Sequence, residues 1–92
     1  MVMVKIVWDE PKRRANLRKH GFDFADAERV FAGITYTIED HRFEYGERRF
    51  VTFGMLQDTV VVMAHAETPT AVRMISMRKA TRNEQILFFQ NL

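Results

Sequence analysis

The sequence predicts an α+β fold in which two N-terminal helices and one C-terminal helix pack on an antiparallel sheet. Three observations lead to this prediction. Helix start and stop signals fill the first third of the chain, apolar and polar residues alternate from Ile34 onward, and a helix-capping pattern follows the last alternating segment. Helices packed on one face of an antiparallel sheet make a two-layer α+β arrangement.

Residues 2–8 are rich in β-branched side chains and predict a short first strand. The helix after it has clear bounds, because Asp9 can cap its start, Pro11 fits its first turn and Gly21 suits the left-handed residue after its last turn. We expect this helix to present cations to solvent or to a polyanion. Its basic side chains are Lys12, Arg13, Arg14, Arg18, Lys19 and His20.

A second helix is predicted to begin near Asp23, which can cap it, and to end at Gly33. Its apolar residues recur at helical spacing, which predicts one buried face. That face consists of Phe24, Ala27, Val30 and Phe31.

The period changes to two from Ile34, as is typical of half-buried strands. We predict strands over 34–39, 48–53, 59–66 and 71–78, a polar connection over 40–46, and turns over 54–58 and 67–70. A last hairpin centred on Pro69 gives three cross-strand pairs: His65 with Arg73, Met63 with Ile75, and Val61 with Met77.

The pattern from Thr81 to Glu84 is a capping box and predicts a terminal helix. Four adjacent apolar residues reach all sides of a helix. The helix is therefore either packed on every side or exposes part of this segment to a partner or to a second copy. The four residues are Ile86, Leu87, Phe88 and Phe89.

The composition predicts one domain, residues 1–92, in the cytoplasm. The chain has no cysteine, which excludes disulfides, thiolate metal sites and cysteine nucleophiles. The longest apolar run, 60–64, is too short to cross a membrane, and no signal-peptide cleavage site follows residues 1–8. The net charge is only +2, but acidic and basic residues are segregated along the chain, which predicts one acidic and one basic face.

A functional cluster is predicted at one end of the sheet. Glu47, Arg49, His65 and Arg73 meet there if the middle hairpin has the register that selects Arg49 rather than Arg48. By strand alternation, Arg78 points to the opposite face from Arg73 unless the chain bends.

This cluster has the groups that cleave RNA without a metal ion. A base removes the proton of the 2′-hydroxyl, an acid protonates the leaving 5′ oxygen, and cations stabilise the charge on phosphorus. Imidazole titrates near neutral pH, and arginine binds phosphate through two parallel hydrogen bonds. Taken singly, each of these residues is better explained as an ordinary surface residue, and Glu47 by a simple ion pair with Arg49.

The sequence favours no metal ion or cofactor. His20, His41 and His65 lack the spacing of metal ligands, and neither a paired-carboxylate motif nor a glycine-rich phosphate loop is present. Ser76 lacks the motif that surrounds the nucleophile of serine hydrolases. Trp8 could stack on a base, although packing in the core is its more ordinary role.

Taken together, the motifs resemble those of BrnT-type toxins of bacterial type II toxin–antitoxin systems, over nearly the whole chain and in order. The matching segments are Trp8-Asp9-Glu10-x-Lys12, Asn16-Leu17-x-Lys19-His20-Gly21, Phe24-x-x-Ala27-x-x-Val30-Phe31, Gly46-Glu47-x-Arg49, Val61-Val62, His65-x-Glu67 and Arg73-x-Ile75-Ser76-x-Arg78-Lys79-Ala80-Thr81-x-x-Glu84.

The resemblance implies a RelE-like fold and a ribonuclease that blocks translation. It also implies a cognate antitoxin with a ribbon-helix-helix domain. The antitoxin would bind DNA, and the toxin would be linked to DNA only through it. The expected phosphate-binding residues are Arg49, Arg73 and Arg78, and the expected proton-transfer groups are Glu47 and His65.

Lys12 and Lys79 are expected to assist RNA binding. The alternative is a non-catalytic module on the same fold that binds RNA or protein, or a decayed toxin that retains only its partner interface.

Overall fold

The computed structural model describes residues 5–92 and contains a five-stranded sheet in the order β1-β5-β4-β3-β2. The part of the predicted first strand before residue 5 lies outside the described residues. Among those residues, no helix is long and apolar enough to cross a membrane. The elements are β1 (Lys5–Val7), α1 (Glu10–His20), the 3-10 helix η1 (Phe24–Asp26), α2 (Ala27–Phe31), β2 (Thr35–Glu39), β3 (Arg49–Leu56), β4 (Thr59–Glu67), β5 (Ala71–Lys79) and α3 (Arg82–Gln90).

The sheet is mixed rather than wholly antiparallel, so the prediction was wrong at one edge. Strands β2 to β5 form the expected antiparallel meander, but β1 runs parallel to β5 and pairs Lys5 with Ala71 and Val7 with Arg73. An alternating pattern gives no strand direction, and the long connection between β1 and β5 permits a parallel pairing.

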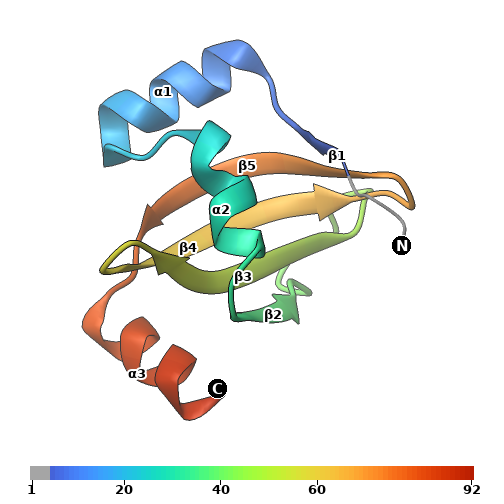
Figure 1. Cartoon of the computed structure of the whole chain (residues 1–92). Helices are drawn as coiled ribbons and strands as arrows, with labels where there is room; N and C mark the ends of the chain where they lie inside the picture. Colours follow the sequence, from blue (N-terminus) through green and yellow to red (C-terminus); the bar gives the residue numbers. More distant parts are fainter. Residues whose placement is uncertain (1–4) are drawn as a thin grey trace.

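The two faces of the sheet are covered unequally. The first two helices lie over one face, and α3 lies beyond the opposite face at the end of β5 (Figure 1), so the prediction that the helices share one face was wrong. The helix-covered face holds the larger core cluster: Phe24, Ala27, Val30, Val61, Met63, Val72, Met74 and Met77. On the α3 side, a smaller cluster consists of Phe53, Val60, Val62, Ala80 and Phe88.

Helix α1 has the predicted caps. The Asp9 side chain accepts a hydrogen bond from the Lys12 backbone N–H at 3.2 Å, and Gly21 adopts φ 77° while its N–H donates to the Leu17 carbonyl. The second predicted helix is split into η1 and α2, and Asp23 caps η1 through the Ala25 N–H.

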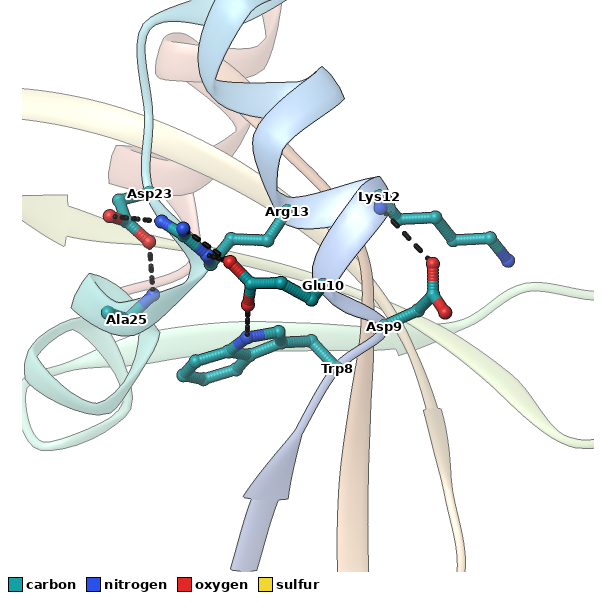
Figure 2. A network of polar contacts seen from close by, with 7 residues as sticks. All are labelled: Trp8, Asp9, Glu10, Lys12, Arg13, Asp23 and Ala25. Carbon is teal, nitrogen blue, oxygen red and sulfur yellow. Dashed lines mark hydrogen bonds and ion pairs between the residues drawn. The ribbon is translucent and has the colours of Figure 1, made fainter.

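A polar network fixes the start of α1 (Figure 2). The Arg13 guanidinium binds Glu10 within the helix and Asp23 beyond it, the latter at 2.9 Å. The Trp8 indole N–H donates to Glu10 at 3.2 Å, and its ring packs beside the larger core cluster. Arg13 therefore connects the start of α1 to the turn before η1, and Trp8 donates to the same Glu10 carboxylate that Arg13 binds.

Asn16 is the buried residue of α1, and it connects this helix to β5. Its amide donates to the Met77 carbonyl at 2.9 Å and accepts from the Met77 N–H at 3.0 Å; it also donates to the Phe22 carbonyl. In the described residues, β1 pairs with β5 only as far as Arg73. Asn16 thus satisfies backbone groups that a longer edge strand would otherwise pair.

The predicted turn over 54–58 was wrong, because β3 continues to Leu56 and only Gln57 and Asp58 form the turn. Gly54 lies inside the strand, where Val30 of α2 approaches its backbone. A Cβ atom on Gly54 would be 2.5 Å from Cγ1 of Val30. Glycine is required here for close helix–sheet packing rather than for a turn.

The predicted register of the last hairpin was also wrong. His65 pairs with Met74, Met63 with Met77 and Val61 with Lys79. The shift has two causes. The hairpin turn consists of Pro69 and Thr70 rather than being centred on Pro69, which moves each partner by one residue. In addition, β5 contains a bulge at Ile75, because Ala64 pairs with Ser76 and His65 with Met74. A bulge adds one residue to one strand and reverses the expected alternation after it.

His65 lies in the helix-side core, fully buried, and not beside Arg73. Its ring stacks on Phe50 and meets the edge of Phe31, and Nε2 lies 2.8 Å from Oγ1 of Thr52 in a hydrogen bond. Nδ1 lies 3.4 Å from the Glu67 carboxylate but makes no hydrogen bond within the described part of the chain. Burial lowers the pKa of His65 to about 4, so the neutral ring is the folded form.

We predict that Asn16→Ala lowers the free energy of unfolding by about 2 kcal/mol, because it leaves the buried N–H and C=O of Met77 unpaired. Thermal unfolding should show a decrease in Tm of about 10 °C. Arg14→Ala, at an exposed position of the same helix, is the control and should leave Tm unchanged. Equal Tm values for the two variants would contradict this role for Asn16.

We also predict that His65 makes the fold sensitive to mild acid. Its folded pKa of about 4 is below the unfolded value of 6.5, so protons bind preferentially to the unfolded chain as pH falls through this range. Urea unfolding should show that the native protein loses about 2 kcal/mol more stability than His65→Gln between pH 7 and pH 4.5. Parallel losses in both proteins would contradict the prediction.

Candidate functional site

The face of the sheet opposite α1 and α2 carries three rows of paired side chains. Because Ala66 pairs with Arg73 and Val62 with Arg78, the bulge places both arginines on this face, contrary to simple alternation. Adjacent rows are about 7 Å apart along the strands. The arginine row is Arg49, Ala66 and Arg73; the floor row is Val51, Ala64 and Ser76; the third row is Phe53, Val62 and Arg78.

The arginine row is joined by one carboxylate. Glu47 accepts hydrogen bonds from Arg73 at 2.6 and 2.8 Å and from Arg49 at 3.1 Å. All three side chains are about one-third exposed. Arg73 first, and Arg49 second, hold the pKa of Glu47 below its ordinary value. Two guanidiniums and one carboxylate give this group of three side chains a net charge of +1.

The Tyr45 ring packs against the Arg49 guanidinium, a contact that the sequence did not predict. The Arg49 guanidinium lies 4.2 Å from the centre of the Tyr45 ring, and the Tyr45 hydroxyl donates to Asp40 at 2.9 Å. Asp40 also accepts hydrogen bonds from Arg42. These bonds, with a smaller contribution from the Tyr45 hydroxyl, hold the pKa of Asp40 far below its ordinary value. The only sequence signal was an aromatic residue just before the turn at Gly46, which suggests no partner by itself.

Arg78 is paired differently from Arg73. Its guanidinium binds both oxygens of Glu84 at 2.7 and 2.8 Å, and this ion pair lowers the pKa of Glu84 to about 2. Glu84 also accepts from the Thr81 N–H as part of the capping box that begins α3. The capping motif therefore fixes the position of the ion pair.

A groove of about 410 Å³ lies over the floor row, between the loop after β2 and the start of α3. Its floor includes Val51, Ala64 and Ser76, and Arg78 and Glu84 line it on the α3 side. Ser76 therefore faces the groove, which the sequence analysis did not predict.

The other sequence-predicted residues lie elsewhere. His65 is buried on the opposite face of the sheet, so the predicted four-residue cluster contains Glu47, Arg49 and Arg73 without it. Lys12 is exposed in the first turn of α1, and Lys79 lines a separate hollow with Phe89 at the end of β5.

This arrangement can bind phosphate groups and accept a proton. Exposed guanidiniums that share a carboxylate can exchange it for phosphate oxygens, and the released carboxylate is then a base. Within residues 5–92, no three His, Asp or Glu side chains gather as metal ligands would.

Comparison with known proteins agrees with the resemblance noted in the sequence. Residues 8–84 match the family model of the ribonuclease toxin BrnT of type II toxin–antitoxin systems. The fold matches the 1.1 Å crystal structure of the Brucella abortus ribonuclease toxin BrnT with a TM-score of 0.64 and 30% identity, covering 87% of this chain and 100% of that one. No curated protein matches. From its sequence and its fold, the chain belongs to the BrnT family of type II toxin–antitoxin ribonuclease toxins.

Proposed function

We propose that this protein is a metal-independent endoribonuclease whose active site is the arginine row with Glu47. The observation that carries the proposal is that Arg49 and Arg73 share one carboxylate on an accessible face of the sheet. Phosphate is the natural competitor for such a pair, because it accepts the same two-pronged hydrogen bonds.

Substrate binding frees the base in this mechanism. The RNA phosphate takes over the hydrogen bonds of Arg73 and Arg49, and the Glu47 carboxylate turns to the neighbouring 2′-hydroxyl. Glu47 removes that proton, the 2′ oxygen forms a bond to phosphorus, and the bond from phosphorus to the 5′ oxygen breaks. The 5′ oxygen takes a proton from water, and the hydroxide so formed takes the proton held by Glu47, which restores the carboxylate. The products are a 2′,3′-cyclic phosphate and a 5′-hydroxyl end. The two guanidiniums stabilise the charge on phosphorus.

Arg78 has a supporting role in this proposal, and His65 has none. Arg78 lies on the same face two rows away, about 13 Å along the strand from Arg73, so it contacts a different part of the RNA. His65 contacts Thr52 and two phenylalanine rings on the other face. Lys12 and Lys79, both exposed, attract the polyanion at longer range.

We further propose that RNA cleavage in the cytoplasm blocks translation, and that a cognate ribbon-helix-helix antitoxin neutralises the toxin and alone contacts DNA. Helix α3 offers a surface for this partner, because Ile86 and Phe89 are about half exposed and Leu92, just after the helix, is 63% exposed, while Phe88 is buried. Glu84 of the same helix lines the groove. A protein bound along α3 would therefore also restrict access to the groove.

The first test is RNA integrity in bacterial cells after induction of this chain alone. The native sequence should cut RNA and stop growth, and the double variant Arg49→Ala/Arg73→Ala should do neither, since loss of one such cationic donor already costs about 100-fold or more. Arg48→Ala is the matched control, because Arg48 binds Glu39 and not Glu47.

Cut RNA in cells that express the double variant would refute this placement of the active site. Intact RNA with the native protein, in the presence of soluble protein that binds RNA, would favour the non-catalytic module.

A second test separates the base from the phosphate-binding groups. Glu47→Gln keeps the size of the side chain but removes its capacity to accept a proton, so cleavage of a labelled single-stranded RNA should slow at least 100-fold. Binding of the same RNA, measured by fluorescence anisotropy, should stay equal or become tighter, because no carboxylate competes for the arginines. Rapid cleavage by this variant would show that Glu47 only pairs with arginine.

A further inference from the structure

We infer that the groove over the floor row binds one nucleobase of the RNA, beside the phosphate held by Arg49 and Arg73. This inference rests on the proposed function and specifies how its substrate is seated. The groove adjoins the arginine row directly, since Val51 follows Arg49 by two residues and Ala64 precedes Ala66 by two.

The floor of the groove is low because its side chains are small. Ala64 pairs with Ser76 across β4 and β5, and the rows on either side carry the long side chains of Arg73 and Arg78. The row spacing places the floor about 7 Å along the strands from the arginine row on one side and from the third row, with Arg78, on the other. A base can therefore lie on the floor while its phosphate stays within reach of the arginine row.

The shape and lining of the groove suit a planar base. Its volume of about 410 Å³ accommodates a nucleobase, and Val51, Ala64 and Ile38 provide an apolar surface for the ring. Polar groups line it as well: the Ser76 hydroxyl and the Arg78–Glu84 pair, and on the side of the loop after β2 the side chains of Glu39, Asp40, His41 and Arg42. Single-stranded RNA is read in this way, by contacts to the face of a base and hydrogen bonds to its edge.

Charge distinguishes the groove from the phosphate site. Arg49 and Arg73 share a single carboxylate, which leaves an excess of positive charge in the arginine row. In the groove the charges are paired: on the wall formed by the loop after β2, Arg42 binds Asp40. On the α3 side, Arg78 is matched by Glu84 through two hydrogen bonds, and the capping box holds Glu84 in place. This neutral pair offers both donors and acceptors, which suits the edge of a base better than a second phosphate.

The test compares nucleoside 5′-monophosphates with ribose 5-phosphate, which has the same phosphate and sugar but no base. In NMR titrations of the full chain, at least one of the four nucleotides should bind 10-fold or more tightly than ribose 5-phosphate. The backbone amide signals of Ala64 and Ser76 should shift with that nucleotide and not with ribose 5-phosphate.

Ala64→Leu fills the floor and should reduce nucleotide affinity to that of ribose 5-phosphate, without changing the affinity for ribose 5-phosphate. Ala32→Leu is the control, since Ala32 is an exposed residue after α2. Ser76→Val is a smaller change that serves the same purpose if Ala64→Leu does not fold.

Equal affinities of all nucleotides and ribose 5-phosphate, no binding of either at millimolar concentration, or nucleotide-induced shifts confined to other regions would each overturn the inference. An RNA cleavage assay on the same preparation separates the two proposals. If RNA is cut but nucleotides and ribose 5-phosphate bind equally, only the proposed base site is refuted. If RNA is not cut but binding depends on the base, the proposed ribonuclease activity is refuted and the base site stands.

Discussion

The extra residue at Ile75 in β5 determines which side chains share a face of the sheet. Before the bulge Met74 faces the helix-side core, and after it Met77 does so as well, although strict alternation would separate them. The same shift brings Arg73 and Arg78 together on the opposite face. Without the bulge, either a core methionine or an arginine would point to the wrong side, so the core and the candidate site depend on one irregularity.

The bulge requires support, because it interrupts the ladder of hydrogen bonds with β4. Asn16 holds β5 from its other edge, where β1 no longer pairs: it binds both backbone groups of Met77, two residues after the bulge. The Trp8–Glu10–Arg13 network in turn fixes the start of α1. The basic helix therefore has a structural function that its charge does not reveal: it fixes the edge of the strand that carries the arginines.

Local signals in the sequence predicted the fold well, and distant pairings were predicted poorly. The caps at Asp9 and Thr81 were correct because each involves residues within one helical turn. Register, the bulge and the direction of β1 depend on contacts far apart in the chain, which no local pattern contains. His65 illustrates the consequence: a shift in pairing moved it from the predicted cluster into the core, while Glu47, Arg49 and Arg73 still met.

The unequal covering of the two faces explains how one small sheet can hold both a core and a site. The helix-covered face buries His65 and the core methionines, so that water is excluded from their side chains. On the α3 side, the side chains of Glu47, Arg49 and Arg73 stay about one-third exposed. Glu84 belongs to both the capping box and the groove wall, so the start of α3 cannot move without moving Arg78. The stability of α3 is thus coupled to the shape of the groove through Glu84, and a partner that shifts this helix would change the groove without touching the arginine row.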